Sequence, residues 1–186
     1  MSRMASLQGW RNEGFRPQRA NRVSGDTAQR RRKNDELEER DFPEAAHMIR
    51  TIEVTVATKG HCDVHDLTAS LSEAIQRSGL REGQVLVFVP GATAGVTTVE
   101  FEPGLIRDLH EFFEAILPER RNYHHHATWG DDNGASHLRA ALLKPALPIP
   151  FRDGTPLLGT WQQLVLVDFD TRPRRRRVIF QLTGES

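Results

Sequence analysis

The sequence predicts an α+β fold: a single domain in which a mixed or antiparallel β-sheet is combined with two to three helices. One observation is that strand-like alternation of apolar and polar residues occurs near both ends of the region from 49 to 185. Two further segments have the apolar spacing of amphipathic helices. Several predicted strands also follow one another as hairpins rather than as βαβ units, which favours α+β. At 186 residues and 38% hydrophobic, the chain can bury one core.

The first half of this domain is predicted to contain two strands and a helix. Residues 52–56 alternate as in a half-buried strand. A helix follows, which Thr68 can cap and Gly79 ends. The apolar run 84–89 then predicts a central strand, and a Pro-Gly pair stops it.

The middle of the chain is predicted to be extended and then helical. β-branched residues indicate an extended segment over 96–101. Pro103 starts a helix whose apolar stripe reaches Ile116, and residues 136–143 form a short helix.

The last part of the chain is predicted to consist of strands. Segments 147–151 and 156–158 flank an Asp-Gly step, which predicts a hairpin turn. Two long strands, 160–169 and 174–182, then close the chain around Thr171-Arg172-Pro173.

Residues 1–46 differ from the rest, and we predict a disordered tail or a mis-called N-terminal extension ahead of a domain at 47–186. Basic and acidic residues are mixed along this stretch, and it contains few branched aliphatic residues. An organellar transit peptide and a nucleic-acid contact are alternatives that the acidic residues disfavour. Met48 directly precedes the first strand pattern and is a candidate natural start.

Composition excludes several function classes. The 25 basic and 25 acidic residues cancel, so no domain-wide field points to nucleic acid. We find no apolar run of the roughly 18 residues that span a bilayer, and expect no membrane partner. Cys62, the single cysteine, cannot form an internal disulfide, which favours a cytoplasmic location.

The segment from Tyr123 to His137 carries the main chemical signal. It contains four of the eight histidines, and its Asp-Asp-Asn-Gly sequence is typical of a turn. His125 and His137 lie on either side of that turn, so their rings are expected to converge on one ion or phosphate. The alternative is a polar surface loop without a ligand.

Three motifs in order identify a resemblance. They are Pro90–Glu100 (Pro-Gly-Ala-Thr-Ala-Gly-Val-Thr-Thr-Val-Glu), the Tyr123–His137 loop, and Leu158–Gln163 (Leu-Gly-Thr-Trp-Gln-Gln). Together they resemble the YjbQ family, also called the secondary thiamine-phosphate synthase family, over roughly Ile49 to Glu185. The resemblance implies a small α+β protein that assembles as a homotrimer. It also implies an activity that joins a pyrimidine pyrophosphate to a thiazole phosphate.

The resemblance places the family's metal site on His125, His126 and His137, with His137 also catalytic. Zinc is the expected metal, and magnesium is the alternative for pyrophosphate chemistry. His61 and Cys62 form a weaker candidate site for a soft metal. Many family members have a histidine where this chain has Gly91, which weakens any mechanism that uses that histidine.

Other polar residues are candidates for catalysis and substrate binding. Glu100 is the candidate proton acceptor, with a helix-capping role as the alternative. The remaining candidates for substrate binding are Thr97, Thr98, Asn133, Ser136, Trp161 and Gln162. Trp161 fits a core or trimer interface equally well. Arg174–Arg177 should alternate across the final strand, which favours edge protection and subunit pairing over an anion-binding wall.

Two functions follow from these residues. One is a phosphate-handling transferase resembling thiamine-phosphate synthase, acting on a small phosphorylated substrate. The alternative is a non-catalytic metal- or small-ligand-binding trimer.

Overall fold

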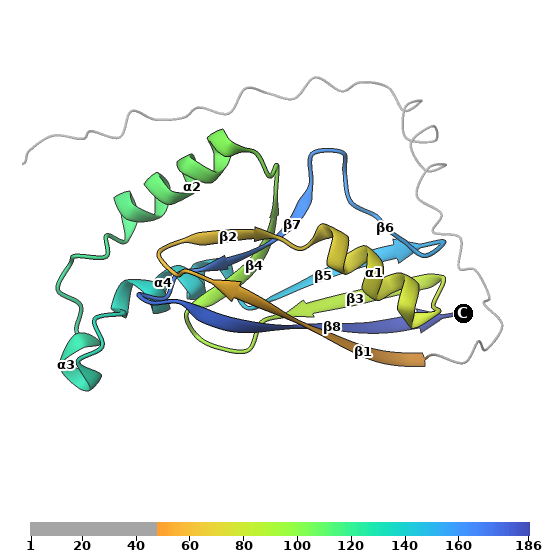
Figure 1. The fold of residues 1–186 in the computed structure, drawn as a ribbon, viewed down its shortest axis with the longest axis horizontal. Coiled ribbons are helices and arrows are strands. Elements are labelled where there is room, and N and C mark those ends of the chain that lie inside the picture. The colour runs from red at the N-terminus through yellow and green to blue at the C-terminus, as the bar shows by residue number, and fades with distance from the viewer. Residues whose placement is uncertain (1–47) are drawn as a thin grey trace, which may run out of the picture. The chain divides into compact units, whose positions relative to one another are not determined.

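The computed structural model describes residues 48–186, and the predicted tail at 1–46 lies outside this part (Figure 1). The described residues form eight strands and four helices. In chain order the elements are β1 (Met48–Thr58), β2 (Asp63–Asp66), α1 (Thr68–Ser78), β3 (Glu82–Phe88), β4 (Ala94–Val99), α2 (Pro103–Ile116), α3 (His126–Trp129), α4 (Gly134–Leu143), β5 (Ala146–Arg152), β6 (Thr155–Pro156), β7 (Gln163–Asp168) and β8 (Arg174–Glu185).

The strands form two antiparallel sheets. The predicted α+β class is confirmed, but the prediction of a single mixed or antiparallel sheet is wrong. The larger sheet has the order β1-β8-β3-β5-β6, and the smaller has the order β2-β7-β4. Within residues 48–186, β5 and β6 are the only consecutive strands that pair, around the predicted Asp153-Gly154 turn. The other expected hairpins are wrong. Most pairings instead join strands far apart in the sequence.

The strands β7 and β8 occupy different sheets although only the segment 169–173 separates them. The reason lies in β7, which is apolar on both faces and therefore needs cover on both sides. Leu164 and Leu166 pack into one core, while Val165 and Val167 pack into another. β7 is therefore an inner strand.

Two hydrophobic cores lie on the two sides of the smaller sheet. The first joins α1, the inner face of the larger sheet and one face of the smaller sheet, with Leu71, Val85 and Phe180 fully buried. The second lies under α2 and α4 and contains Phe113 and Phe169, whose rings meet edge to face at 4.8 Å. These cores fix the ends of β7 and β8, from which the site residues project.

The helix α1 has the predicted apolar face, and Gly79 ends it in the left-handed conformation (φ 73°). Its predicted cap is wrong. Leu67 occupies the cap position, and the hydroxyl of Thr68 instead accepts a hydrogen bond from the Leu164 backbone nitrogen. The side chain thus ties α1 to β7.

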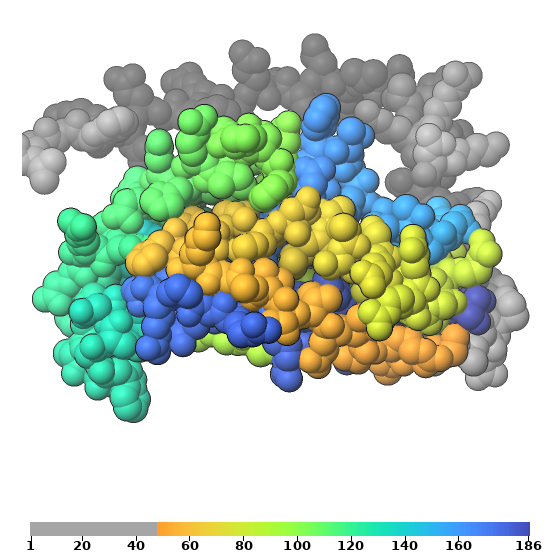
Figure 2. Space-filling view, viewed as in Figure 1, coloured from red at the N-terminus to blue at the C-terminus, as the bar shows by residue number. Residues whose placement is uncertain are grey.

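The helix α2 begins after Glu102, whose carboxylate accepts hydrogen bonds from the backbone nitrogens of Gly104 and Leu105. Only Phe113 of this helix is buried. Figure 2 shows α2 and the segment between β6 and β7 next to each other at the upper edge of the described residues. The short helix α3 falls inside the histidine loop and raises the number of helices above the two to three predicted. None of the helices between residues 48 and 186 has the length and apolar character needed to cross a bilayer.

The arginine run lies at the start of β8, where this strand is paired on one side only. At Arg174–Arg177, β8 pairs with residues 55–58 of β1 on one side. On its other side, β3 reaches only to Phe88, which lies opposite Ile179. After Phe88 the chain turns away from β8 and forms the Pro90–Thr93 loop. A cleft opens between this loop and the arginines.

Candidate functional site

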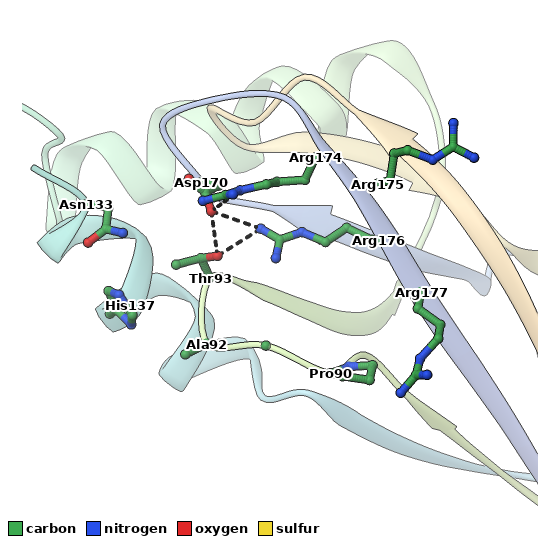
Figure 3. Close-up of a pocket in the computed structure, with 11 residues that line it drawn as sticks. Pro90, Ala92, Thr93, Asn133, His137, Asp170, Arg174, Arg175, Arg176 and Arg177 are labelled. Atoms are coloured by element: carbon green, nitrogen blue, oxygen red, sulfur yellow. Dashed lines mark hydrogen bonds and ion pairs between the residues drawn. The ribbon is translucent and has the colours of Figure 1, made fainter. Parts of the chain in front are cut away.

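A cleft of about 510 Å³ lies between this loop, α4 and the start of β8, and we call it the arginine cleft (Figure 3). It is lined by Pro90, Gly91, Ala92, Thr93, Asn133, His137, Asp170, Arg174, Arg175, Arg176 and Arg177. Arg174 and Arg176 point toward Asp170 and Thr93, whereas Arg175 and Arg177 diverge from them (Figure 3). The predicted alternation of the arginine side chains is therefore present.

Arg176 is held rigidly beneath the cleft. Its Nε and Nη2 donate to the two carboxylate oxygens of Asp168 at 2.7 and 2.6 Å, and Nη2 also donates to the Thr93 hydroxyl at 2.8 Å. The hydroxyl of Thr58 donates to the same carboxylate. Such a bidentate pair fixes the plane of the guanidinium, so Arg176 meets a ligand without reorganising.

Asp170 is the second buried carboxylate. Its Oδ2 accepts hydrogen bonds from Arg174 Nε at 2.8 Å and from the Thr93 hydroxyl at 2.9 Å. Burial opposes ionisation, but these hydrogen bonds outweigh it and lower the pKa of Asp170. The Gly60 turn lies tightly against the Asp170 backbone: the His61 backbone nitrogen donates to the Asp170 carbonyl oxygen at 2.8 Å, and a Cβ on Gly60 would lie 2.3 Å from that oxygen. The Asp170 carboxylate is therefore ionised and held in a fixed position in the wall of the cleft.

His125 and His137 lie side by side next to this network. Their ring centroids are 4.5 Å apart, and His125 Nε2 is 3.7 Å from Asp131 Oδ1. His137 comes from the first turns of α4, while His125 precedes α3. Burial, followed by the neighbouring His125, lowers the pKa of His137, so its ring is neutral near pH 7.

His126, the third predicted metal ligand, is engaged elsewhere. Its Nε2 accepts a hydrogen bond from the Gly134 backbone nitrogen at 3.2 Å, and its ring meets Tyr123 edge to face. Across residues 48–186, no three His, Cys, Asp or Glu side chains are grouped so as to hold a metal ion. The structure therefore does not bring the three predicted metal ligands together.

Asn133 and Ser136 lie near the start of α4 but differ in accessibility. Asn133 lines the cleft, and its Oδ1 is buried without a hydrogen-bond partner. Ser136 is 1% exposed, and its hydroxyl donates to the Phe169 carbonyl oxygen. Ser136 therefore fastens α4 to the end of β7, whereas Asn133 is available to a ligand.

The other predicted site residues gather at the far end of the smaller sheet. Gln162 Nε2 donates to the Thr98 hydroxyl at 3.0 Å, and Trp161 is 72% exposed. Thr97 lies within β4 and Glu100 just after it; β4 starts at the cleft and ends roughly 16 Å away at about 3.3 Å per residue. One chain does not bring these residues to the histidines.

The alternative metal site at His61 and Cys62 is wrong. His61 Nδ1 lies 3.0 Å from Glu119 Oε2 at the surface, while Cys62 packs in the second core. Burial raises the pKa of the Cys62 thiol to about 11, so the thiolate that a metal requires is disfavoured. Cys62 is thus a core residue.

The sequence interpretation missed the carboxylates Asp168 and Asp170 altogether. Their signal is the Asp-Phe-Asp triplet at the end of an apolar strand, followed closely by four arginines. Opposite charges of this density next to a buried strand indicate a paired polar network.

Comparisons with known proteins identify relatives along the described domain. The chain is 35% identical over 128 residues to a UPF0047 protein of Archaeoglobus fulgidus, which covers 69% of this chain and 97% of the relative. It is 37% identical over 130 residues to a UPF0047 protein of Mycobacterium tuberculosis, which covers 69% of this chain and 85% of the relative.

Solved structures show the same fold. A protein of unknown function from Sulfolobus solfataricus matches with a TM-score of 0.71 and 28% identity, covering 75% of this chain and 99% of that one. A hypothetical protein from Aeropyrum pernix matches with a TM-score of 0.69 and 32% identity, covering 73% and 99%.

These matches overturn the predicted activity. The relatives carry only the UPF0047 designation, the Sulfolobus protein is described as of unknown function, and residues 48–186 lack a three-ligand metal group. The prediction of a transferase resembling thiamine-phosphate synthase is therefore wrong.

The resemblance to the family is nevertheless confirmed. The model of the family described as UPF0047 protein YjbQ-like matches residues 52–185. This range includes every strand except the first four residues of β1, and every residue of the arginine cleft. The chain therefore belongs to the YjbQ-like UPF0047 family.

Proposed function

We propose that this protein binds a small anionic ligand, bearing a phosphate or carboxylate group, in the arginine cleft. The observation that carries the proposal is the arginine-rich lining of the cleft, in which Arg174 and Arg176 point inward and keep donors that Asp170 and Asp168 do not use. A volume of about 510 Å³ also suits a small molecule, since ligand pockets run from about 300 to 1,000 Å³.

The arginines have donors to spare for such a ligand. Within residues 48–186, Nη1 of Arg176 makes no hydrogen bond and lies beside Gly91. Arg174 uses only its Nε, on Asp170, so both of its Nη atoms remain available. Guanidinium groups match the geometry of phosphate and carboxylate oxygens, and buried counter-charges hold these two in place. The arrangement supports binding of an anion by preorganised donors.

Calorimetric titration with inorganic phosphate tests the proposal. Arg174→Ala should weaken binding about tenfold, because a hydrogen bond to a charged group is worth about 1.5–3 kcal/mol. Arg152→Ala is the matched control, since Arg152 is 62% exposed and pairs only with Glu82. Equal phosphate affinities for the two variants, or no phosphate binding by the wild type, would contradict the proposal.

A divalent metal ion, with zinc favoured over magnesium, is a second proposal. The observation that favours it is the close approach of the His125 and His137 rings, with Asp131 nearby. Two imidazoles need a third ligand, which water or a neighbouring subunit can supply. Zinc content measured by mass spectrometry should fall to background in a His125→Ala, His137→Ala double variant. Unchanged content would place any metal elsewhere.

We also propose that the protein assembles as a homotrimer. The support is exposed apolar surface on α2 and on the segment between β6 and β7: Phe112 and Ile116 of α2 are 55% and 43% exposed, and Trp161 is 72% exposed. Large exposed apolar side chains in one region are typical of association surfaces.

A further inference from the structure

Three buried side-chain polar atoms between residues 48 and 186 have no hydrogen-bond partner: two are on residues that line the arginine cleft, and the third is on His125, next to His137. They are His125 Nε2, Asn133 Oδ1 and Asp170 Oδ1. Asp170 and Asn133 are only 2% and 7% exposed. Leaving a buried acceptor unpaired is unfavourable, and native proteins leave few such atoms. Their concentration here points to a ligand that donates hydrogen bonds to them.

The two oxygen acceptors lie next to the arginine donors. Asn133, Asp170 and Arg174 line both the arginine cleft and a second hollow of about 300 Å³, which we call the side hollow. The other residues of the side hollow are Gly130, Asp131, Thr171 and Arg172. One small molecule can therefore reach the arginines with one group and the two acceptors with another.

We propose that the ligand carries a cationic, hydrogen-bond-donating group next to its anionic group, as an aminoalkyl phosphate or an amino acid does. This inference rests on the proposed function. The anionic group meets Arg174 and Arg176. The ammonium group donates to Asp170 Oδ1 and Asn133 Oδ1 in the side hollow, where the carboxylates of Asp131 and Asp170 balance the charges of Arg172 and Arg174. Asp170 is suited to both contacts, because its Oδ2 holds the arginines while its Oδ1 is unused.

The test compares 2-aminoethyl phosphate with 2-hydroxyethyl phosphate and ethyl phosphate by calorimetry on metal-free protein. All three share the phosphate and differ only at the second group. We expect the amine to bind at least tenfold more tightly than ethyl phosphate. Equal affinities would overturn this inference and leave the proposed function standing, whereas no binding of any of them would defeat both. A hydroxyl that binds as tightly as the amine would overturn the requirement for a cation.

Two substitutions of Asn133 move the preference in opposite directions. Asn133→Leu removes the acceptor at similar size and should bring the ratio of the amine and ethyl phosphate affinities down toward one. Asn133→Asp adds a negative charge to a side chain of similar shape and should raise that ratio several-fold. This variant tests the inference even if the leucine variant fails to fold. A ratio that moves in the same direction in both variants would contradict the inference. So would a preference that appears only after zinc is added, because the metal would then occupy these atoms.

Discussion

Arg176 and Asp168 form a bidentate ion pair in the protein interior, with N–O distances of 2.7 and 2.6 Å and side chains 9% and 0% exposed. The pair joins the start of β8 to the end of β7, two strands that belong to different sheets. It therefore fixes the relative position of the two sheets at the arginine cleft.

Asp168→Asn should lower the free energy of unfolding by about 3–5 kcal/mol, because it leaves the buried charge of Arg176 without its main partner. Chemical denaturation measures the change. The control is Glu53→Gln, which weakens a surface pair with Arg177 at 3.6 Å and should cost under about 1 kcal/mol. A similar small loss in both variants would show that the buried pair does not tie the sheets together.

Gly91→Ala should weaken phosphate binding. Its Cβ would lie 3.3 Å from Arg176 Nη1 and crowd the free donor, and its φ of 132° disfavours any side chain. Gly154→Ala is the control for backbone strain, since Gly154 also has a positive φ but its Cβ would meet nothing within 4 Å. Both variants should lose about 1–2 kcal/mol of stability, and only Gly91→Ala should lose affinity in calorimetry. Undiminished affinity in Gly91→Ala would exclude Nη1 as a ligand donor.

His137 should make the stability depend on pH below neutrality. Because burial and His125 lower its pKa, the unfolded chain binds a proton more readily than the folded chain between that lowered pKa and about 6.5. The free energy of unfolding should therefore decrease as the pH falls through 6.5 and level off below the folded-state pKa. Urea titrations at several pH values should show a shallower decrease in His137→Gln than in His110→Gln, whose histidine lies on the exposed side of α2. Parallel curves for the two variants would contradict the assignment.

The homotrimer predicts a particle of three times the 21.1 kDa chain mass in size-exclusion chromatography with light scattering. Phe112→Glu, which places a charge on the exposed apolar face of α2, should reduce the particle to a monomer without unfolding it. Arg107→Glu changes an exposed polar position of the same helix and should leave the assembly intact. A wild-type monomer at micromolar concentration would rule out the trimer.

Local patterns were sufficient to predict much of the secondary structure. The spacing of Leu71, Ala74 and Ile75 ahead of Gly79 identified α1, and the Asp-Gly step identified the hairpin of β5 and β6. These features depend on interactions between residues a few positions apart, which the sequence displays directly. The approach of His125 and His137 is similarly local, since only α3, one turn and the start of α4 lie between them.

Strand pairing and the arginine cleft were decided by tertiary structure. The alternation along β7 showed two apolar faces, but it did not reveal which core each face would enter, and the expected pairing of neighbouring strands was wrong. Arg176 meets Thr93 across 83 positions, because β3 ends before the arginine run and the chain turns back over it. The sequence indicated most of the strands, although not β2, and it determined which residues carry charge. The tertiary structure determined where those charges meet. Because β7 is buried on both sides, the carboxylates at its end must be paired, and the arginines that pair with them come from the other sheet.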